Sequence, residues 1–405
     1  MNYDLLQFLL GPVGTELLDE LAPTPITPDN QLQIASRLRQ LFQPEQAQAA
    51  MEIVLLRQLA AGKFANASQM FFTRAALEQS SSEVISTYRA RRFAAAGFDR
   101  VADLGCGIGG DALGLAAHGD VIGVDLDLVR LAMARENLGI YGFEHRFLPV
   151  QADLLTMRPL PVQAAFFDPA RRDQQGRRFF SMRQYQPPMT IIQRWREKIP
   201  STAVKISPGV NYEELPDDAE LEFISVNGDV KEGVLWFGQL HSGVSRRATL
   251  LPGGDCLTTD EMAPELVPIG SPKNYLYEPD KAVIRAHLVE ALAQQLGADK
   301  IDEEIAYLTS DSVQDSPFAR CFAVEAVFPF QLKQLRHYLR LHNIGRVTIK
   351  KRGSPLEPEA LRRQLRLRGS QHRIIFLTHV LGEPTVLIGF EIKPHSPDSL
   401  RQLEG

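Results

Sequence analysis

Apolar residues recur at intervals of three and four positions through the first part of the chain, up to about residue 95. The spacing is clearest over residues 31–42, 44–61 and 80–95, where it matches the period of an amphipathic helix. No stretch before Val101 alternates apolar and polar positions as a half-buried strand does. We therefore expect a helical N-terminal domain over residues 1–95.

From about residue 98 the pattern changes, and short apolar runs alternate with segments of helical period. Strand–helix alternation of this kind predicts βαβ units and a mostly parallel sheet, hence an α/β core over residues 96–242. The last two runs flank Asn227-Gly228, a pair typical of tight hairpin turns, so we expect them to pair antiparallel at the sheet edge. The predicted strands are 100–104, 121–124, 146–150, 164–167, 203–206, 221–226 and 234–240.

A third pattern begins after residue 242. Glycines and prolines between residues 253 and 272 indicate a loop-rich link, and residues 280–296 follow with the period of a single helix. Strands and helices then alternate to residue 392, which predicts an α+β domain over residues 243–405. Its expected strands are 321–330, 346–351, 373–380 and 385–392, and its expected helices are 331–342 and 357–368.

Composition limits the classes of protein that fit. The 405 residues are 44% hydrophobic and 23% charged, values typical of a soluble globular chain and long enough for two or three domains. The three cysteines lie far apart, which argues against a disulfide framework or a zinc site. We expect a cytoplasmic location, because the first residues lack a basic leader and no run approaches the length of a membrane span.

The strongest chemical motif is Asp103-Leu104-Gly105-Cys106-Gly107-Ile108-Gly109-Gly110, between a predicted strand and a predicted helix. Glycines allow a tight turn and close approach of a ligand, and the following helix N-terminus favours negative charge. The spacing also satisfies the dinucleotide fingerprint GxGxxG, with Asp125 at the ribose-binding distance. A carboxylate at Asp103 would repel a pyrophosphate, whereas it suits the ammonium group of S-adenosylmethionine.

Two further acids follow predicted strands. Asp125 ends the second strand, where a carboxylate can accept both ribose hydroxyls, and Asp127 is the better candidate for the N-cap of the next helix. Asp153 follows the third strand, and a plain loop aspartate is the alternative there. The carboxyl ends of strands are where open α/β sheets bind ligands.

The fourth strand ends in Asp168-Pro169-Ala170-Arg171. In methyltransferases that act on amino nitrogens, this place reads [D/N]-P-P-[aromatic]; the acid and a backbone carbonyl accept from the target N–H groups and hold the nitrogen in line with the methyl group. Here Ala170 replaces the second proline and Arg171 the aromatic residue. A stacking surface is then expected from Phe179, Phe180, Tyr185 or the Arg171 guanidinium.

Together these motifs resemble class I S-adenosylmethionine-dependent methyltransferases. The Asp103–Asp111 run, with Asn137 and Tyr141-Gly142, is similar to the trimethylguanosine synthase branch, and Gln69–Arg74 resembles the segment that closes over the cofactor there. Tyr275–Asp280 and Val347–Gly353 resemble the THUMP-like domain of bacterial RNA methyltransferases. The resemblance implies a Rossmann-like fold, catalytic roles for Asp168 and Pro169, and no metal. It implies S-adenosylmethionine binding by Asp103, Gly105, Gly107, Gly109, Asp125, Leu126, Asp153 and Leu154.

Local charge favours RNA as the partner, tRNA or rRNA in particular, although the net charge of the chain is −5. Residues 171–183 carry a net +4, and residues 331–373 carry twelve basic and two acidic side chains. Solvated helix faces are the alternative explanation. Oligomeric state is not predicted. The expected substrate-binding residues are Arg171, Arg172, Arg177, Arg178, Lys350, Lys351 and Arg352.

The leading hypothesis is therefore an RNA methyltransferase that acts on a base nitrogen. Three alternatives stay open: a methyltransferase for a small molecule or a protein, an RNA-binding protein with a non-catalytic methyltransferase fold, and an NAD-dependent oxidoreductase.

Overall fold

The structure is a computed structural model that describes residues 1–170, 181–259 and 266–392. Contacts divide the chain into two compact units. The first comprises Met1–Glu220 with Glu232–Gly243, and the second comprises Leu221–Lys231 with Val244–Gly405. The three-domain division at residues 95 and 242 stays a prediction.

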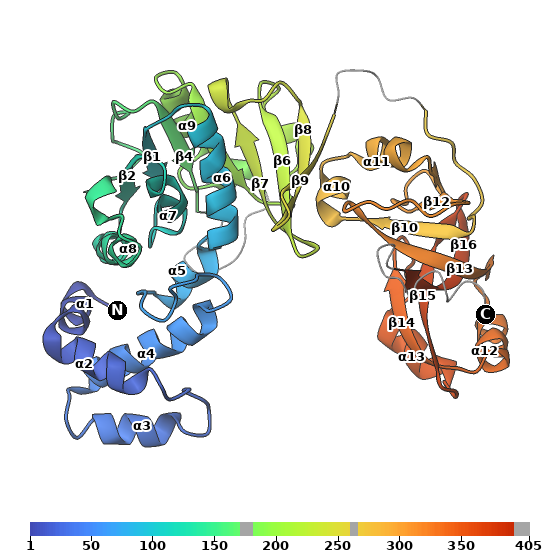
Figure 1. Cartoon of the computed structure of the whole chain (residues 1–405), viewed down its shortest axis with the longest axis horizontal. Helices are drawn as coiled ribbons and strands as arrows, with labels where there is room; N and C mark the ends of the chain where they lie inside the picture. The colour runs from blue at the N-terminus through green and yellow to red at the C-terminus, as the bar shows by residue number, and fades with distance from the viewer. Residues whose placement is uncertain (171–180, 260–265, 393–405) are drawn as a thin grey trace. The chain divides into compact units, whose positions relative to one another are not determined.

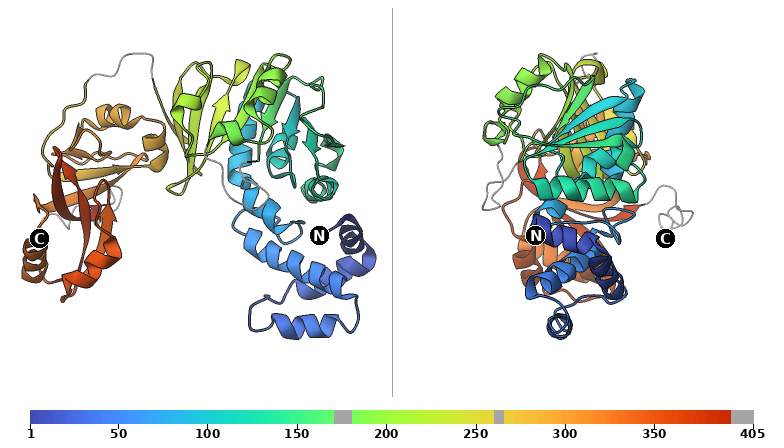
Figure 2. Two further views of the ribbon diagram at one scale, coloured as in Figure 1. Left: turned by 180° about the vertical axis from the view of Figure 1, so that it is seen from behind. Right: turned by 90° about the vertical axis from the view of Figure 1, so that its left-hand side faces the viewer.

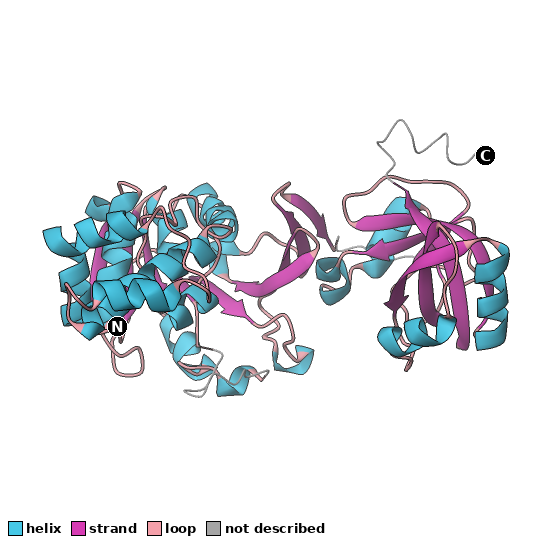
Figure 3. Cartoon of the chain, turned by 90° about the horizontal axis from the view of Figure 1, so that it is seen from below, coloured by secondary structure: helices cyan, strands magenta, loops and turns pink. Residues whose placement is uncertain are grey.

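The first unit begins with helices only, as the apolar spacing predicts, and α1, α2 and α3 each contact α4 (Figure 1). In Figure 3 the N-terminus lies beside a group of helices. Their leucines, such as Leu6, Leu17 and Leu38, are buried where the helices meet. The helices are α1 (Tyr3–Leu10), α2 (Pro12–Leu21), α3 (Gln31–Leu38), α4 (Pro44–Ala60), α5 (Arg74–Gln79) and α6 (Glu83–Ala95).

The predicted α/β core follows and is confirmed. Its strands lie in the order β3-β2-β1-β4-β5-β7, parallel except for β7, which runs antiparallel to β5. Figure 2 shows this sheet from two further sides. Because the parallel strands share one direction, their carboxyl ends lie along one edge. The strands are β1 (Arg100–Leu104), β2 (Asp120–Asp125), β3 (Phe147–Gln151), β4 (Ala164–Phe167), β5 (Ser201–Ile206) and β7 (Asp229–Trp236), and the helices are α7 (Gly110–Ala116), α8 (Leu128–Ile140) and α9 (Met189–Arg196).

Asn227-Gly228 separates β6 (Glu220–Val226) from β7, as the sequence predicts. Both residues have positive φ, 51° for Asn227 and 85° for Gly228. A two-residue type I′ turn requires that backbone conformation at both central positions, and asparagine and glycine adopt it at low cost.

The second unit holds a seven-stranded sheet in the order β11-β12-β10-β13-β16-β15-β14, of which only the pair β14·β15 is parallel among the pairings described. Strands β6, β8 and β9 also belong to this unit. The further strands are β8 (Arg246–Leu251), β9 (Asp255–Thr258), β10 (Tyr275–Pro279), β11 (Asp299–Lys300), β12 (Leu308–Ser310), β13 (Ala319–Pro329), β14 (Ile344–Lys351), β15 (Gln371–Val380) and β16 (Glu383–Ile392).

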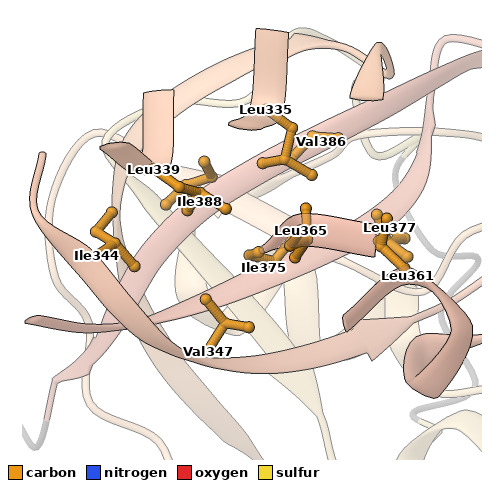
Figure 4. Close-up of a cluster of buried hydrophobic side chains, with 10 residues drawn as sticks. All are labelled: Leu335, Leu339, Ile344, Val347, Leu361, Leu365, Ile375, Leu377, Val386 and Ile388. Atoms are coloured by element: carbon orange, nitrogen blue, oxygen red, sulfur yellow. The ribbon is translucent and has the colours of Figure 1, made fainter. Parts of the chain in front are cut away.

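The period-2 pattern of β15 builds two cores on opposite faces of this sheet. Ile375 and Leu377 point toward α12 (Leu332–Leu341) and α13 (Pro358–Leu365), where Leu335 and Leu361 meet them (Figure 4). The alternate residues Ile374 and Phe376 pack on the other face with Tyr307 and Phe322. Both faces are therefore covered, which explains why the strand reads as one continuous apolar run.

Two predictions about residues 243–296 are wrong. The expected loop-rich link between residues 253 and 272 contains the strand β9. The single helix expected over 280–296 is two helices, α10 (Lys281–Arg285) and α11 (Val289–Leu296). His287 between them has φ 55°, a left-handed conformation that interrupts a right-handed helix.

Candidate functional site

The glycine-rich turn joins β1 to α7 and needs glycine for its backbone. Gly105, Gly107 and Gly109 have φ values of 93°, 54° and 84°. A Cβ on Gly105 would lie 2.8 Å from the carbonyl oxygen of Asp168, so the glycine turn and the turn after β4 are in direct backbone contact. Gly109 is the N-cap of α7. The turn thus places free helix N–H groups next to the end of β4.

Asp125 ends β2 beside this turn. Its Oδ2 accepts from the Gly107 N–H at 2.9 Å, and its Oδ1 accepts from the Asp127 N–H at 2.9 Å. Each oxygen of a carboxylate has two lone pairs, so both can accept one further hydrogen bond from a ribose hydroxyl. Asp127 caps α8 by accepting from Val129 and Arg130, as the sequence predicts. Leu126 is 67% exposed beside them.

Asp153 lies just past β3. Its Oδ1 accepts from the Leu155 N–H at 2.9 Å, which leaves Oδ2 without a hydrogen bond to another described residue. Leu154 is buried. The Ala152 N–H donates to the Asp125 carbonyl at 3.2 Å, so this segment lies against the end of β2. Asp153 and Asp125 therefore lie on one edge, as a cofactor that spans two strands requires.

Asp103, the acid before the first glycine, is fully buried at the end of β1. Neither of its oxygens has a hydrogen-bond partner within the described part of the chain. Burial, together with the carboxylates of Asp111 and Asp168, raises the pKa of Asp103 well above its ordinary value. An unpartnered buried carboxyl group is costly, and a cationic or N–H-bearing ligand group would offset that cost.

A buried charged cluster, which sequence reasoning missed, surrounds Asp103. Arg89 of α6 pairs with Asp111 and, at 3.0 Å, with Glu232 of β7. Burial lowers the pKa of Arg89, but the surrounding carboxylates, Asp111 and Glu232 foremost, together raise it above its ordinary value. Burial raises the pKa of Glu232. In the sequence, a charged residue within an apolar strand or on the apolar face of a helix could have indicated this cluster, because such residues are rarely buried unless they are paired. The cluster comprises Ser81, Arg89, Asp103, Asp111, Asp168, Lys205 and Glu232.

The predicted catalytic turn follows β4. The Asp168 N–H donates to the Leu104 carbonyl at 3.2 Å, and Asp168 Oδ2 accepts from Lys205 Nζ at 2.7 Å. Pro169 is buried, whereas Ala170 is exposed and exchanges two backbone hydrogen bonds with Gln186. The Asp168–Pro169 turn is thus held from both sides, and Asp168 Oδ1 makes no hydrogen bond within the described ranges.

Several residues expected near this turn lie outside the described residues, namely Arg171, Arg172, Arg177, Arg178, Phe179 and Phe180. Tyr185 is described and cannot stack on a base, because its ring is 1% exposed and its hydroxyl accepts from the Ser207 N–H. Arg183, in the same segment, is exposed.

The Gln69–Arg74 segment lies over the glycine turn. Asn137, fully buried in α8, accepts from the Phe71 N–H at 2.8 Å and donates to the carbonyls of Phe71 and Ile108. Arg57 donates to the carbonyls of Gln69 and Met70. Asn137 therefore ties this segment to the glycine turn, and Tyr141 holds Asn66 and Glu83 nearby.

In the second unit, the residues predicted to bind substrate differ in exposure. Lys350 is mostly buried, pairs with Glu278 and lies 5.0 Å from the centre of the Phe322 ring. Lys351 pairs with Glu357 at 2.5 Å. Arg352 is half-buried, with its guanidinium 5.1 Å from the centre of the Tyr307 ring. These three residues thus have structural partners within the unit.

Most other basic residues between 331 and 373 are exposed. Arg336 and Arg373 are half-buried, and Arg336 donates to the Gln364 carbonyl at the end of α13. Lys333 and Arg340 lie on α12 opposite its buried Leu335 and Leu339. The exposed basic residues of this stretch are Lys333, Arg340, Arg346, Lys351, Arg362, Arg363, Arg366 and Arg368.

Within the described ranges, no three His, Cys, Asp or Glu side chains are grouped so as to hold a metal ion. Nor does any described helix combine the length and apolarity that crossing a bilayer requires.

Comparisons with known proteins indicate the family and the fold. Family models match at residues 98–203 (RNA cap guanine-N2 methyltransferase), 319–390 (THUMP domain-like) and 2–60 (a domain of unknown function). A crystal structure described as that of a "putative methyltransferase from Porphyromonas gingivalis W83" superposes with a TM-score of 0.73. It is 20% identical and covers 91% of this chain and 100% of its own, which supports the fold.

Two sequence relatives from Mycobacterium tuberculosis, strains CDC 1551 and H37Rv, are described as uncharacterized S-adenosylmethionine-dependent methyltransferases. Each is 36% identical over 343 residues, which is 82% of this chain and 92% of the relative. The fully buried Asp103, the left-handed glycines and the half-buried Asp125 fit the cofactor that this description names. With its Rossmann-like core and its THUMP-like C-terminal domain, the chain belongs to the family of S-adenosylmethionine-dependent methyltransferases.

Proposed function

We propose that this enzyme methylates RNA at a base nitrogen. The observation that carries the proposal is Asp168, whose carboxylate follows β4 in backbone contact with the glycine turn and keeps Oδ1 for a further hydrogen bond. A carboxylate there accepts from a target N–H and orients the nitrogen lone pair. The matches to an RNA cap methyltransferase model and to a THUMP-like domain support RNA as the substrate class.

S-adenosylmethionine, when bound, supplies an electrophilic methyl group. We propose that Asp103, Asp125 and Asp153 hold it, with Gly105, Gly107 and Gly109 making room for it and Leu126 and Leu154 packing beside it. Asp168 and Pro169 fix the turn that orients the target. Positioning of this kind contributes much of the rate of a direct displacement.

The RNA is held by basic side chains. We assign this role to the exposed residues of α12 and α13 and, nearer the reaction, to the arginines after Pro169. A basic surface binds the phosphate backbone with little sequence preference. The residues around Asp168 must therefore supply the specificity for the target base.

Transfer of tritiated methyl groups from S-adenosylmethionine to total RNA, taken from cells that lack this gene, tests the proposal. We expect label in RNA with wild type, and a loss of at least ~100-fold with Asp168→Ala. Asp120→Ala, at the opposite end of β2, is the matched control and keeps its activity. Label in protein or small molecules, with none in RNA, would refute the proposed substrate.

A further inference from the structure

Lys205 is a buried lysine whose ammonium group meets the predicted catalytic carboxylate. It belongs to β5, which pairs in parallel with β4 so that Phe167 lies opposite Val204. One position further along, Lys205 Nζ lies 2.7 Å from Asp168 Oδ2. The Lys205 side chain is 4% exposed, so this contact is shielded from solvent.

Groups from two other elements fix the same ammonium group. Lys205 Nζ donates to Ser81 Oγ at 2.9 Å, and Glu232 Oε2 of β7 lies 3.9 Å away. Ser81 donates in turn to Asp111, at the start of α7, and accepts from Arg89. Nζ is therefore in contact with three places in the fold: the turn after β4, the loop before α6, and β7.

Burying so many charged groups costs desolvation free energy, so stability alone does not explain this arrangement. The cluster has three buried carboxyl groups, Asp103, Asp111 and Glu232, and the half-buried Asp168, against two buried cations, Arg89 and Lys205. Apolar residues often stabilise such a position at least as well as a buried ion pair does. Lys205 donates to Asp168 Oδ2 and not to Oδ1, so this hydrogen bond determines which of the two oxygens can face a ligand.

We propose that Lys205 is a positioning residue of the methyl-transfer site, which fixes the orientation of the Asp168 carboxylate so that Oδ1 accepts from the target N–H. The inference rests on the proposed function of Asp168. The inference adds two groups that orient the turn after β4: Lys205, which pairs with Asp168, and Ser81, which contacts Lys205 from the loop before α6.

A double-mutant cycle on the full chain tests this role, with total RNA from cells lacking the gene as the substrate. We expect Lys205→Met to lower kcat at least ~100-fold, with KM for RNA and the Kd for S-adenosylmethionine each changed less than ~3-fold. In an Asp168→Asn background the same substitution costs less than ~3-fold, because its effect passes through Asp168. Lys205→Arg keeps the charge, guards against loss of folding, and recovers part of kcat relative to Lys205→Met.

Arg92→Met is the matched control for destabilisation. Arg92 pairs with the fully buried Glu220, so the variant also removes the cation that pairs with a buried carboxylate, at a place other than the Asp168 turn. It should lower Tm while kcat stays within ~3-fold of wild type. Equal losses from Lys205→Met in both backgrounds, or an unchanged kcat, would overturn the role of Lys205 alone. A wild type that transfers no methyl to RNA would overturn the proposed function, and this inference with it.

Discussion

Folding raises the pKa of Asp103 well above its ordinary value. Its pKa is raised because it is buried beside Asp111 and Asp168, so the native state keeps a proton at pH values where the unfolded chain has released it. The groups that face it are Arg89 and Lys205 as well as those two acids. The stability that this acid contributes is present below the unfolded pKa of 3.8 and is lost as pH rises toward the folded pKa.

Asp103→Asn removes this titration. We expect the free energy of unfolding of the variant, relative to wild type, to increase with pH from about 4 upward, by up to ~1.4 kcal/mol per pH unit until the folded pKa is passed. Urea unfolding at several pH values between about 4 and 8 measures it. A difference between the two proteins that does not vary with pH would contradict a raised pKa at Asp103.

Gly105 is required for two physical reasons. Its φ is 93°, and an added Cβ would meet the Asp168 carbonyl oxygen at 2.8 Å. Gly142→Ala is the matched control, because Gly142 has φ 79° but nothing within 4 Å of its Cβ position. Calorimetry should show Gly105→Ala weakening S-adenosylmethionine binding at least ~10-fold, about 1.4 kcal/mol, and Gly142→Ala leaving it within ~2-fold. Equal affinities for both variants would mean that the contact with Asp168 does not shape the cofactor site.

The sequence predicts the acidic residues of the site better than the basic ones. Asp103, Asp125, Asp153 and Asp168 each follow an apolar run, and strand ends converge on one edge whatever the loops do. Lys205 is one lysine within an apolar run, and only the pairing of β5 with β4 brings it to Asp168. Such partners depend on strand order, which periodicity does not specify.

At the scale of elements, close packing of α6 on α7 places Ser81 and Arg89 in the site. Gly114 in α7 makes this approach possible, since a Cβ there would lie 2.4 Å from the Ser86 carbonyl oxygen. Glycine is otherwise a poor helix former, by ~1 kcal/mol relative to alanine. In α7 the low helix propensity of Gly114 is therefore offset by the close contact with α6.

Gly114→Ala and Gly139→Ala should accordingly change stability in opposite directions. Gly139 lies in α8 at an exposed position, and its nearest neighbour is a side-chain atom at 3.9 Å. There alanine raises the free energy of unfolding by up to ~1 kcal/mol. At Gly114 the clash lowers it by ~1–3 kcal/mol despite the better propensity. Chemical denaturation of both variants measures the difference, and stabilisation by Gly114→Ala would disprove the tight α6–α7 contact.

Element types are predicted well where one period holds over many residues, as in α12 and β15. The sequence misleads at α10 and α11, because apolar spacing continues across His287 although its backbone is left-handed. It also misleads at the start of the expected loop-rich link over residues 253–272, where Gly253-Gly254 marks a turn between β8 and β9. A short strand between turn residues has too few positions to show alternation.

For the whole molecule, the net charge of −5 is an average over unlike regions. Residues 331–373 carry a net +10, so the rest of the chain is strongly acidic. The structure narrows the basic stretch further, because Lys350 and Arg373 pair with Glu278 and Glu325. The cations that remain exposed lie mainly on α12 and around α13.

Charge reversal is a better test of this surface than truncation at residue 243, because residues 221–231 belong to the second compact unit. We expect Lys333→Glu with Arg340→Glu to weaken binding of bulk tRNA. Arg39→Glu with Lys198→Glu makes the same change in net charge at two exposed positions, just after α3 and before β5, and serves as the control.

The salt dependence separates direct phosphate contacts from a general change in field. Each phosphate contact that is lost lowers the slope of log affinity against log salt by ~0.7–0.9, so two contacts lower it by about 1.4 to 1.8. Filter binding between about 50 and 200 mM salt measures the slope for both pairs. If the surface on α12 binds RNA, only the Lys333 and Arg340 pair lowers the slope. An equal weakening by both pairs, with both slopes unchanged, would show that the exposed cations act through net charge and do not touch the phosphates.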